Sequence, residues 1–137
     1  EIIMEIENEL LKLLKKAYKK NEIPVAAIIV YKNKIIAKAY NKRHSNKDVI
    51  DHAEVIAIKK ASKKIKDWRL NECELYTTMK PCDMCKAIIE QSRIKKVYYY
   101  LENDKIVNKK TEYVKLESKE NDKYKSIVKK SFKNRRI

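Results

Sequence analysis

Two short motifs constrain the fold of this chain more than any other feature: residues 52–54 (His-Ala-Glu) and residues 81–85 (Pro-Cys-Asp-Met-Cys). His52, Cys82 and Cys85 are residue types that bind zinc, and they can bind one ion only if the fold joins two segments about 30 residues apart. Three protein ligands leave a fourth position open, which is more typical of catalytic than of structural zinc. Water bound at such a position has a pKa of roughly 7 and provides hydroxide at neutral pH.

The carboxylate of Glu54 completes the first motif. Glu54 follows the histidine by two residues, so it is poorly placed to bind the same ion but well placed to carry protons. His-x-Glu followed by Pro-Cys-x-x-Cys is the signature of zinc nucleobase deaminases. A closed structural site would need a fourth Cys or His, and the remaining candidates, Cys73 and His44, lack ligand spacing to the motifs. We therefore expect a catalytic zinc site that does not need His44.

Both motifs coincide with predicted helix starts. Apolar residues at helical spacing predict a helix over about 52–65. Pro81 fits the first position of a second helix, over about 82–92, because its missing N–H has no partner there in any case. Cys82 and Cys85 would then lie one turn apart in the opening turn, where the helix dipole favours the thiolate.

The remaining periodicity predicts an α/β domain. An amphipathic helix is expected at the N-terminus, and residues 121–134 suggest a final helix. Strands are predicted over Val25–Tyr31, Lys34–Tyr40, Cys73–Thr78 and Val97–Leu101, and Thr111–Leu116 alternates like a further edge strand. Strands that alternate with helices indicate a sheet covered by helices on both faces.

Composition is consistent with one domain over residues 1–137. There is no signal-peptide pattern and no apolar run of 18 residues, so we expect a cytoplasmic protein without a membrane segment. Cys73 lies in a strand pattern and is expected to be a small buried apolar residue. Glycine is absent, so turns must use other residues that tolerate positive φ, and Asn33 between two predicted strands is one such residue.

The charge is strongly positive and unevenly distributed. The chain carries a net +15, of which residues 105–137 contribute +8, whereas residues 1–24 are balanced. This distribution favours contact with a polyanion, with the basic tail as its densest part. The alternative is a solvated surface produced by codon bias, because lysine outnumbers arginine 29 to 5 and arginine is the residue suited to phosphate forks.

The chain resembles the cytidine-deaminase-like superfamily and, within it, the bacterial tRNA adenosine deaminases. The resemblance rests on residues 22–25, Asn41, 52–54, 67–70, 75–76, 81–85 and 92–94. It implies a three-layer α/β/α fold around a central mixed sheet of about five strands, one zinc ion per chain and a homodimer. It also implies substrate contacts for Asn41, Ala53, Pro81 and Asn103, although the family usually has aspartate at this last position.

The resemblance implies conversion of adenosine to inosine in a single-stranded nucleic-acid loop, the tRNA anticodon wobble position. Hydroxide would attack carbon 6 of adenine while Glu54 passes protons to the ring nitrogen and the departing amine. Two alternatives remain open. Residues 75–85 also resemble fungal cytosine deaminases, so free cytosine, guanine or a nucleoside could be the substrate. The second alternative is a subunit that binds zinc and RNA but is not catalytic, and the presence of Glu54 argues against it.

Overall fold

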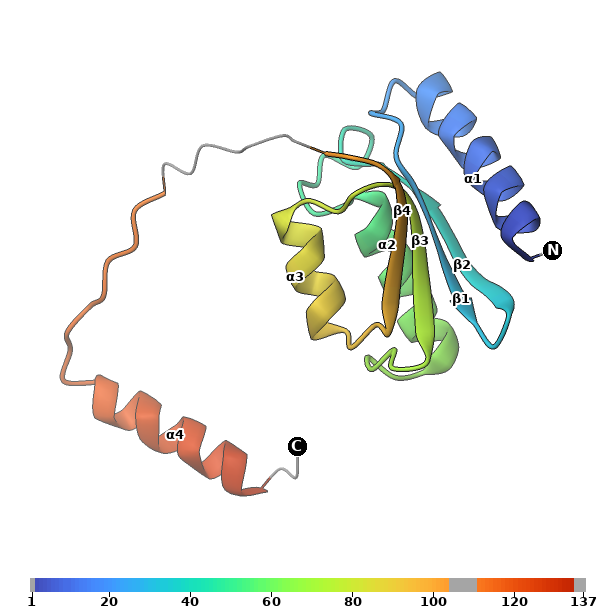
Figure 1. The fold of residues 1–137 in the computed structure, drawn as a ribbon. Coiled ribbons are helices and arrows are strands. Elements are labelled where there is room, and N and C mark those ends of the chain that lie inside the picture. The colour runs from blue at the N-terminus through green and yellow to red at the C-terminus, as the bar shows by residue number, and fades with distance from the viewer. Residues whose placement is uncertain (1, 104–110, 135–137) are drawn as a thin grey trace. The chain divides into compact units, whose positions relative to one another are not determined.

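The computed structural model describes residues 2–103 and 111–134. Its contacts divide the chain into two compact units, Glu1–Lys105 and Ile106–Ile137, which we treat separately. The first unit is a sheet with helices on both faces, and the second contains helix α4 (Asn121–Asn134) (Figure 1). The expectation of a single deaminase domain over residues 1–137 stays a prediction.

The sheet of the first unit is mixed. Its strands are β1 (Ala26–Tyr31), β2 (Lys34–Tyr40), β3 (Cys73–Met79) and β4 (Lys96–Leu101), in the order β2-β1-β3-β4. Strand β1 is antiparallel to both β2 and β3, whereas β4 is parallel to β3. The described residues thus contain four strands, where about five were expected. The predicted strand over Thr111–Leu116 is wrong: this segment is exposed and joins no sheet, because alternation alone supplies no hydrogen-bonding partner.

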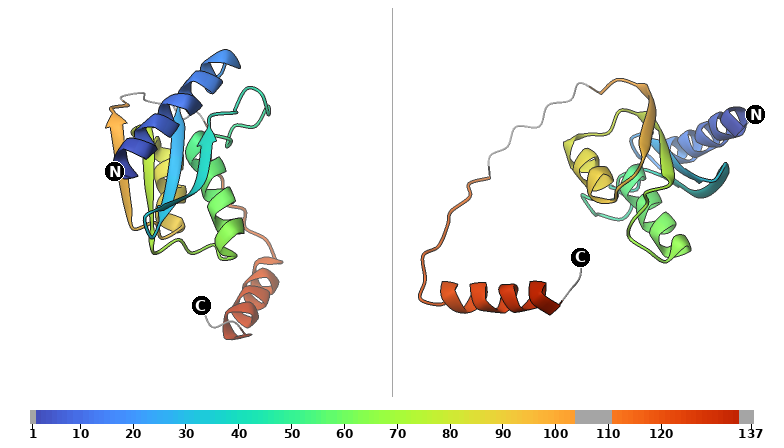
Figure 2. Two further views of the ribbon diagram at one scale, coloured as in Figure 1. Left: turned by 90° about the vertical axis from the view of Figure 1, so that its right-hand side faces the viewer. Right: turned by 60° about the horizontal axis from the view of Figure 1, so that its bottom comes forward.

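Helices cover the two faces of the sheet, as predicted for a three-layer fold. Helix α1 (Ile2–Lys19) lies on one face, and α2 (Ala53–Ile65) and α3 (Asp83–Gln91) lie on the other (Figures 1 and 2). The alternating residues of β1 serve both layers: Ile28 packs in a cluster with α1, and Ile29 packs in a cluster with α2 and α3. Burial on both faces explains why this strand is almost continuously apolar.

The turns reach the left-handed region without glycine. Positive φ occurs at Asn21, Lys32, Asn33, Lys47, Lys66 and Arg93. Lys32 and Asn33, with φ of 49° and 62°, connect β1 to β2, and positive φ at both central residues is the geometry of the type I′ hairpin turn. This agrees with the role predicted for Asn33. Lys66 ends α2 in the same conformation and donates its N–H to the Ser62 carbonyl at 2.8 Å.

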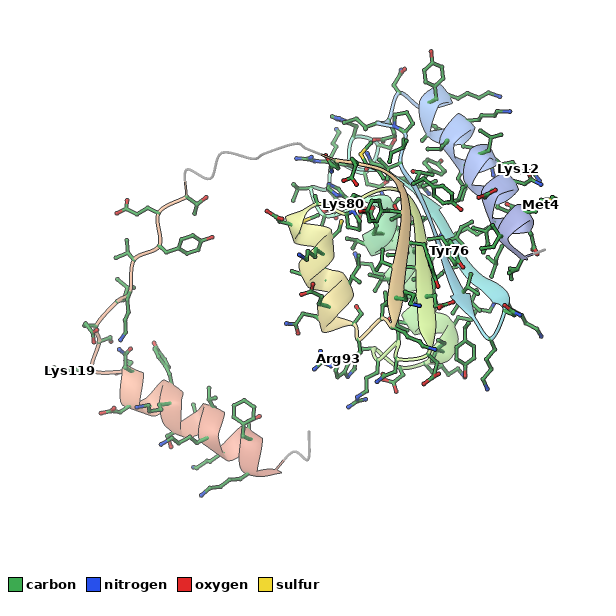
Figure 3. The ribbon with its side chains drawn as sticks, viewed as in Figure 1. Met4, Lys12, Tyr76, Lys80, Arg93 and Lys119 are labelled. Atoms are coloured by element: carbon green, nitrogen blue, oxygen red, sulfur yellow. The ribbon has the colours of Figure 1, made fainter. Side chains whose placement is uncertain are left out.

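The edge strand β4 is rich in tyrosine. Tyr98 stacks on Tyr76 with ring centroids 4.7 Å apart, and Tyr76 lies on the side of the sheet that faces α1 (Figure 3). The hydroxyl of Tyr100 donates to a carboxylate oxygen of Glu7 at 2.9 Å, which links β4 to α1. Burial and this hydrogen bond raise the pKa of Tyr100 to about 12.

Candidate metal centre and active site

The N-terminal ends of α2 and α3 carry the three predicted ligands. His52 is the N-cap of α2, and Cys82 is the N-cap of α3. In Figure 3, Lys80 and Arg93 mark the two ends of α3, and the ligands lie at the Lys80 end. Pro81 was expected at the first helical position, but α3 begins at Asp83, so Pro81 precedes the N-cap. Cys82 has the extended backbone of an N-cap residue. A sequence pattern does not locate the first residue of a helix to within one or two positions.

The distances between the three side chains fit one zinc ion. His52 Nδ1 lies 3.7 Å from Cys82 Sγ and 3.4 Å from Cys85 Sγ. A tetrahedral ion bound to sulfur and imidazole nitrogen at ordinary lengths separates these atoms by about 3.5 Å. One nitrogen and two sulfur donors also match the preferences of zinc. We conclude that His52, Cys82 and Cys85 have the types, spacing and convergence needed to hold zinc through Nδ1 and the two sulfurs.

Among the residues that the structure describes, the group of candidate metal ligands has three members, His52, Cys82 and Cys85. Cys73 is buried in β3 as a free thiol, as predicted, and belongs to no such group. His44 is exposed in the loop before α2 and is also outside the group. The described part of the chain therefore offers three ligands of the His/Cys type and leaves room for a fourth, non-protein ligand.

Burial dominates the electrostatics of Cys85. Cys85 is fully buried, and this burial, followed by the nearby Glu54 carboxylate, raises the pKa of its thiol. The predicted thiolate preference from the helix dipole is outweighed at this position. A bound zinc ion reverses the balance because ligation deprotonates a thiol. Metal binding at this site is therefore expected to release a proton.

Glu54 is a buried carboxylate beside the candidate ligands. It is the second residue of α2 and is only 4% exposed. Burial raises its pKa, and its side chain interacts with that of Cys85. Among the described residues, Glu54 is not in the group that could hold a metal ion, and its role as a proton carrier stays a prediction.

Asn41 lies at the same end of the sheet as His52. It directly follows β2, and the loop that begins after it closes through a hydrogen bond of 3.0 Å from Lys42 N to the Asp51 carbonyl. The Asn41 amide donates to the Ile23 carbonyl at 3.3 Å and accepts from Arg43 N at 3.1 Å. These bonds fix the orientation of the side chain, and they use one of its two N–H groups and one of the two lone pairs of its oxygen.

The other predicted substrate residues lie next to the candidate ligands. Ala53 is fully buried as the first residue of α2, and Pro81 is half-buried before Cys82. Asn103 follows β4 and its side-chain amide donates to the Lys80 carbonyl at 3.4 Å, which places it beside the segment that leads to Pro81. All four residues predicted to contact substrate therefore lie at the metal-site end of the sheet.

Glu22 is a buried acidic residue near the candidate site that sequence analysis did not single out. It is only 4% exposed, and its carboxylate accepts hydrogen bonds from His44 N at 3.1 Å, from Ser45 N at 2.6 Å and from the Ser45 hydroxyl. Burial opposes ionisation, but these hydrogen bonds lower the pKa of Glu22 overall. Residues 22–25 carry part of the family resemblance, which was the one sequence signal for this position.

In the described part of the chain, no helix combines the length and apolar character that crossing a membrane requires.

The chain is similar in sequence to known bacterial enzymes. The chain is 46% identical over 85 residues to the tRNA-specific adenosine deaminase of Aquifex aeolicus and 41% identical over 91 residues to that of Bacillus subtilis. These alignments cover 62% and 66% of this chain. They span only 56% of each relative, slightly more than half its length.

Solved structures and a family model agree with this similarity. The guanine deaminase of Bacillus subtilis matches with a TM-score of 0.80 and 27% identity, covering 96% of this chain and 97% of that one. A structure from a study of A-to-I editing by tRNA:A34 deaminases matches with a TM-score of 0.71 and 31% identity, covering 73% and 77%. The family model described as MafB19-like deaminase matches residues 4–136, and the chain belongs to this deaminase family.

Proposed function

We propose that this protein is a zinc-dependent deaminase that converts adenosine to inosine in a single-stranded tRNA loop, at the anticodon wobble position. The observation that carries the chemistry is the convergence of His52 Nδ1, Cys82 Sγ and Cys85 Sγ within 4.8 Å of one another, next to the buried Glu54. The choice of substrate is supported by relatives at 41–46% identity that are named tRNA-specific adenosine deaminases.

In this proposal the three ligands and Glu54 have separate tasks. His52, Cys82 and Cys85 hold the zinc ion, which when bound supplies an activated water as the nucleophile for hydrolysis. Glu54 would accept one proton of that water and deliver it to the ring nitrogen of the base, which makes the attacked carbon more electrophilic. It would then move the second proton of the same water to the amino group, so that the carbon–nitrogen bond breaks, ammonia leaves and inosine remains. Such a positioned acid–base group contributes about 10²–10⁴-fold to a rate.

The residues around the ligands would bind the base. Asn41 has a free N–H and a free lone pair on a fixed amide, which suits the edge of a flipped purine. Ala53, Pro81 and Asn103 would line the rest of the pocket, as the family resemblance implies. A base in an anticodon loop is the least costly to flip because it is not held in a duplex.

The basic tail is the proposed contact for the RNA backbone. In α4 the side chains of Lys123, Lys125, Lys129, Lys130 and Lys133 are all exposed. Phosphate contacts by lysine carry no sequence information but increase affinity through counterion release. The tail would therefore hold the nucleic acid while the pocket selects the base.

We also propose a cytoplasmic homodimer. Tyr98, Tyr99, Tyr100 and Leu101 alternate between the two faces of the edge strand β4, and each is more than a third exposed. An edge strand with exposed large side chains is a surface suited to pairing with a second copy of the chain. Analytical ultracentrifugation should give twice the chain mass. A single-chain mass at micromolar concentration would contradict the dimer.

A second function has specific support. The guanine deaminase match covers 96% of this chain at a TM-score of 0.80, more than the tRNA-deaminase structure does. The zinc-ligand set and the proton carrier would serve both reactions, so the substrate alone distinguishes them.

One experiment separates the two functions. The zinc-loaded protein is incubated separately with an anticodon stem-loop, total tRNA, single-stranded DNA, free guanine, free cytosine and adenosine, and the products are measured by mass spectrometry. We expect inosine in the stem-loop, formed at least about a hundredfold more slowly after Glu54→Gln substitution. Glu72, an exposed acid in the α2–β3 connection, gives the matched control variant Glu72→Gln. Xanthine from guanine with unmodified RNA would contradict the proposal in favour of the second function.

A further inference from the structure

Glu22 is a buried carboxylate that the proposed chemistry does not use. It lies in the connection between α1 and β1, yet all of its hydrogen-bond donors belong to the loop between β2 and α2, 22 or 23 residues further along the chain. A buried carboxylate without partners is strongly unfavourable, so its position depends on these donors. Equally, the exposed residues His44 and Ser45 are tied to the body of the protein through this one side chain.

The loop that Glu22 holds connects two parts of the candidate site. It begins next to Asn41, which we expect to contact the base, and it ends at His52, which we expect to bind zinc. Asn41 is itself tied to the same connection, because its side chain donates to the Ile23 carbonyl and its N–H donates to the Val25 carbonyl. The α1–β1 connection therefore contacts the start of the loop through backbone carbonyls and its middle through the Glu22 carboxylate.

Glycine is absent from this loop, so its path depends on bonds such as these. Lys47 adopts φ of 49°, a conformation that is unfavourable for a residue with a side chain unless its surroundings hold it. Hydrogen bonds to a charged acceptor are roughly twice as strong as neutral ones. Three of them converge on Glu22. The other charged contacts of the loop lie at its His52 end, where Asp51 accepts from the Asn46 amide at 2.8 Å and pairs with Lys59 of α2 at 3.8 Å. Glu22 is therefore the charged contact of the middle of the loop, at His44 and Ser45.

We propose that Glu22 is a positioning residue that anchors the loop between β2 and α2 and so sets the affinity of the candidate site for its substrate. The effect on substrate affinity rests on the proposed function, because that function defines the substrate. The anchoring of the loop by Glu22 does not depend on it. Glu22 acts through the loop and Asn41 and touches none of the reacting atoms. Its loss should therefore raise KM and leave kcat, which depends on Glu54 and the metal, nearly unchanged.

The test uses Glu22→Gln, which keeps the shape of the side chain but turns an N–H₂ group toward N–H and O–H donors. Amide hydrogen exchange of the zinc-loaded protein, measured without substrate, should be roughly tenfold or more faster at His44 and Ser45. KM for the stem-loop should rise by roughly tenfold, with kcat within about twofold, because the lost interaction is made equally in the ground and transition states. Zinc content should not change.

Ser45→Ala is the second variant, because it removes the hydroxyl donor and keeps both backbone donors. It should give a smaller increase in exchange, and its effect should not add to that of Glu22→Gln, since both act on one contact. Glu72→Gln should change neither the amide exchange at His44 and Ser45 nor KM. If Glu22→Gln does not fold, the exchange in Ser45→Ala decides whether the contact anchors the loop.

The outcomes are distinguishable. Unchanged exchange at His44 and Ser45 would overturn the anchoring, and faster exchange with unchanged KM and reduced kcat would overturn the role in affinity. Failure of the unmodified protein to deaminate any RNA would remove the proposed function instead. The exchange measurement would then still decide the anchoring by itself.

Discussion

Replacement of Glu54 by glutamine separates proton transfer from metal binding and folding. The side chain is 4% exposed, so a substitution that changed its volume would leave a cavity or a clash. Glutamine has nearly the same shape, and it removes a charge that burial disfavours. The free energy of unfolding should therefore change by about 1.5 kcal/mol or less.

The effect on the rate should be far larger than the effect on stability. Glutamine neither accepts nor delivers a proton, so the loss should equal the contribution of a positioned acid–base group, about 10²–10⁴-fold in kcat. This corresponds to about 2.7–5.5 kcal/mol in the activation barrier. Zinc should remain bound at one ion per chain, because the three grouped ligand residues are untouched.

The assay measures inosine formation under single-turnover conditions, zinc by mass spectrometry and Tm by calorimetry on the same preparation. Glu72→Gln controls for loss of an acidic group elsewhere. Loss of zinc in parallel with activity would refute our division of roles, since Glu54 would then act on the metal. A decrease in kcat of less than tenfold would refute the assignment of Glu54 as the proton carrier.

Three further predictions follow from the site and the tail. We expect one zinc ion per chain, and Cys82→Ser should lower both zinc content and Tm and abolish the effect of a chelator on Tm; zinc-free protein from a chelator-free purification would contradict the site. His44→Ala should keep its zinc, because His44 lies outside the ligand group of the described residues, and zinc loss in this variant would require a different coordination set. Truncation after Phe132 should weaken binding to an anticodon stem-loop and make its salt dependence shallower by about 0.7–0.9 per lost phosphate contact, without changing turnover at saturation. Removal of three lysines from α1 is the control, and an unchanged salt slope in the truncated protein would exclude the tail from recognition.

Local pattern and local chemistry were sufficient for much of the fold. The strand boundaries of β2 were predicted to the residue, and Asn33 adopts the positive φ expected of it. These features depend on neighbours in the chain: alternation, helical spacing and turn chemistry are all short-range properties. The ligand types were readable for the same reason, because His52, Cys82 and Cys85 are named by motifs that require particular donors.

The sequence-based predictions were wrong where the outcome depends on contacts with other parts of the folded chain. Thr111–Leu116 has the alternation of a strand, but a strand exists only when another strand receives its hydrogen bonds, and the pattern does not say whether one is available. At Cys85 the sequence suggested a stabilised thiolate, whereas burial, a property of the folded surroundings, raises the pKa of the thiol.

The sequence by itself determined which residues carry the candidate chemistry, and only the tertiary structure decided how they are held. A glutamate between a helix and a proline, such as Glu22, is most often solvated, and its sequence neighbours do not indicate otherwise. Its burial and its role follow from donors at His44 and Ser45, more than 20 residues away, that the sheet brings to it. Long-range contacts of this kind depend on how the chain packs, whereas the identity of a zinc ligand depends on the atoms of a single residue.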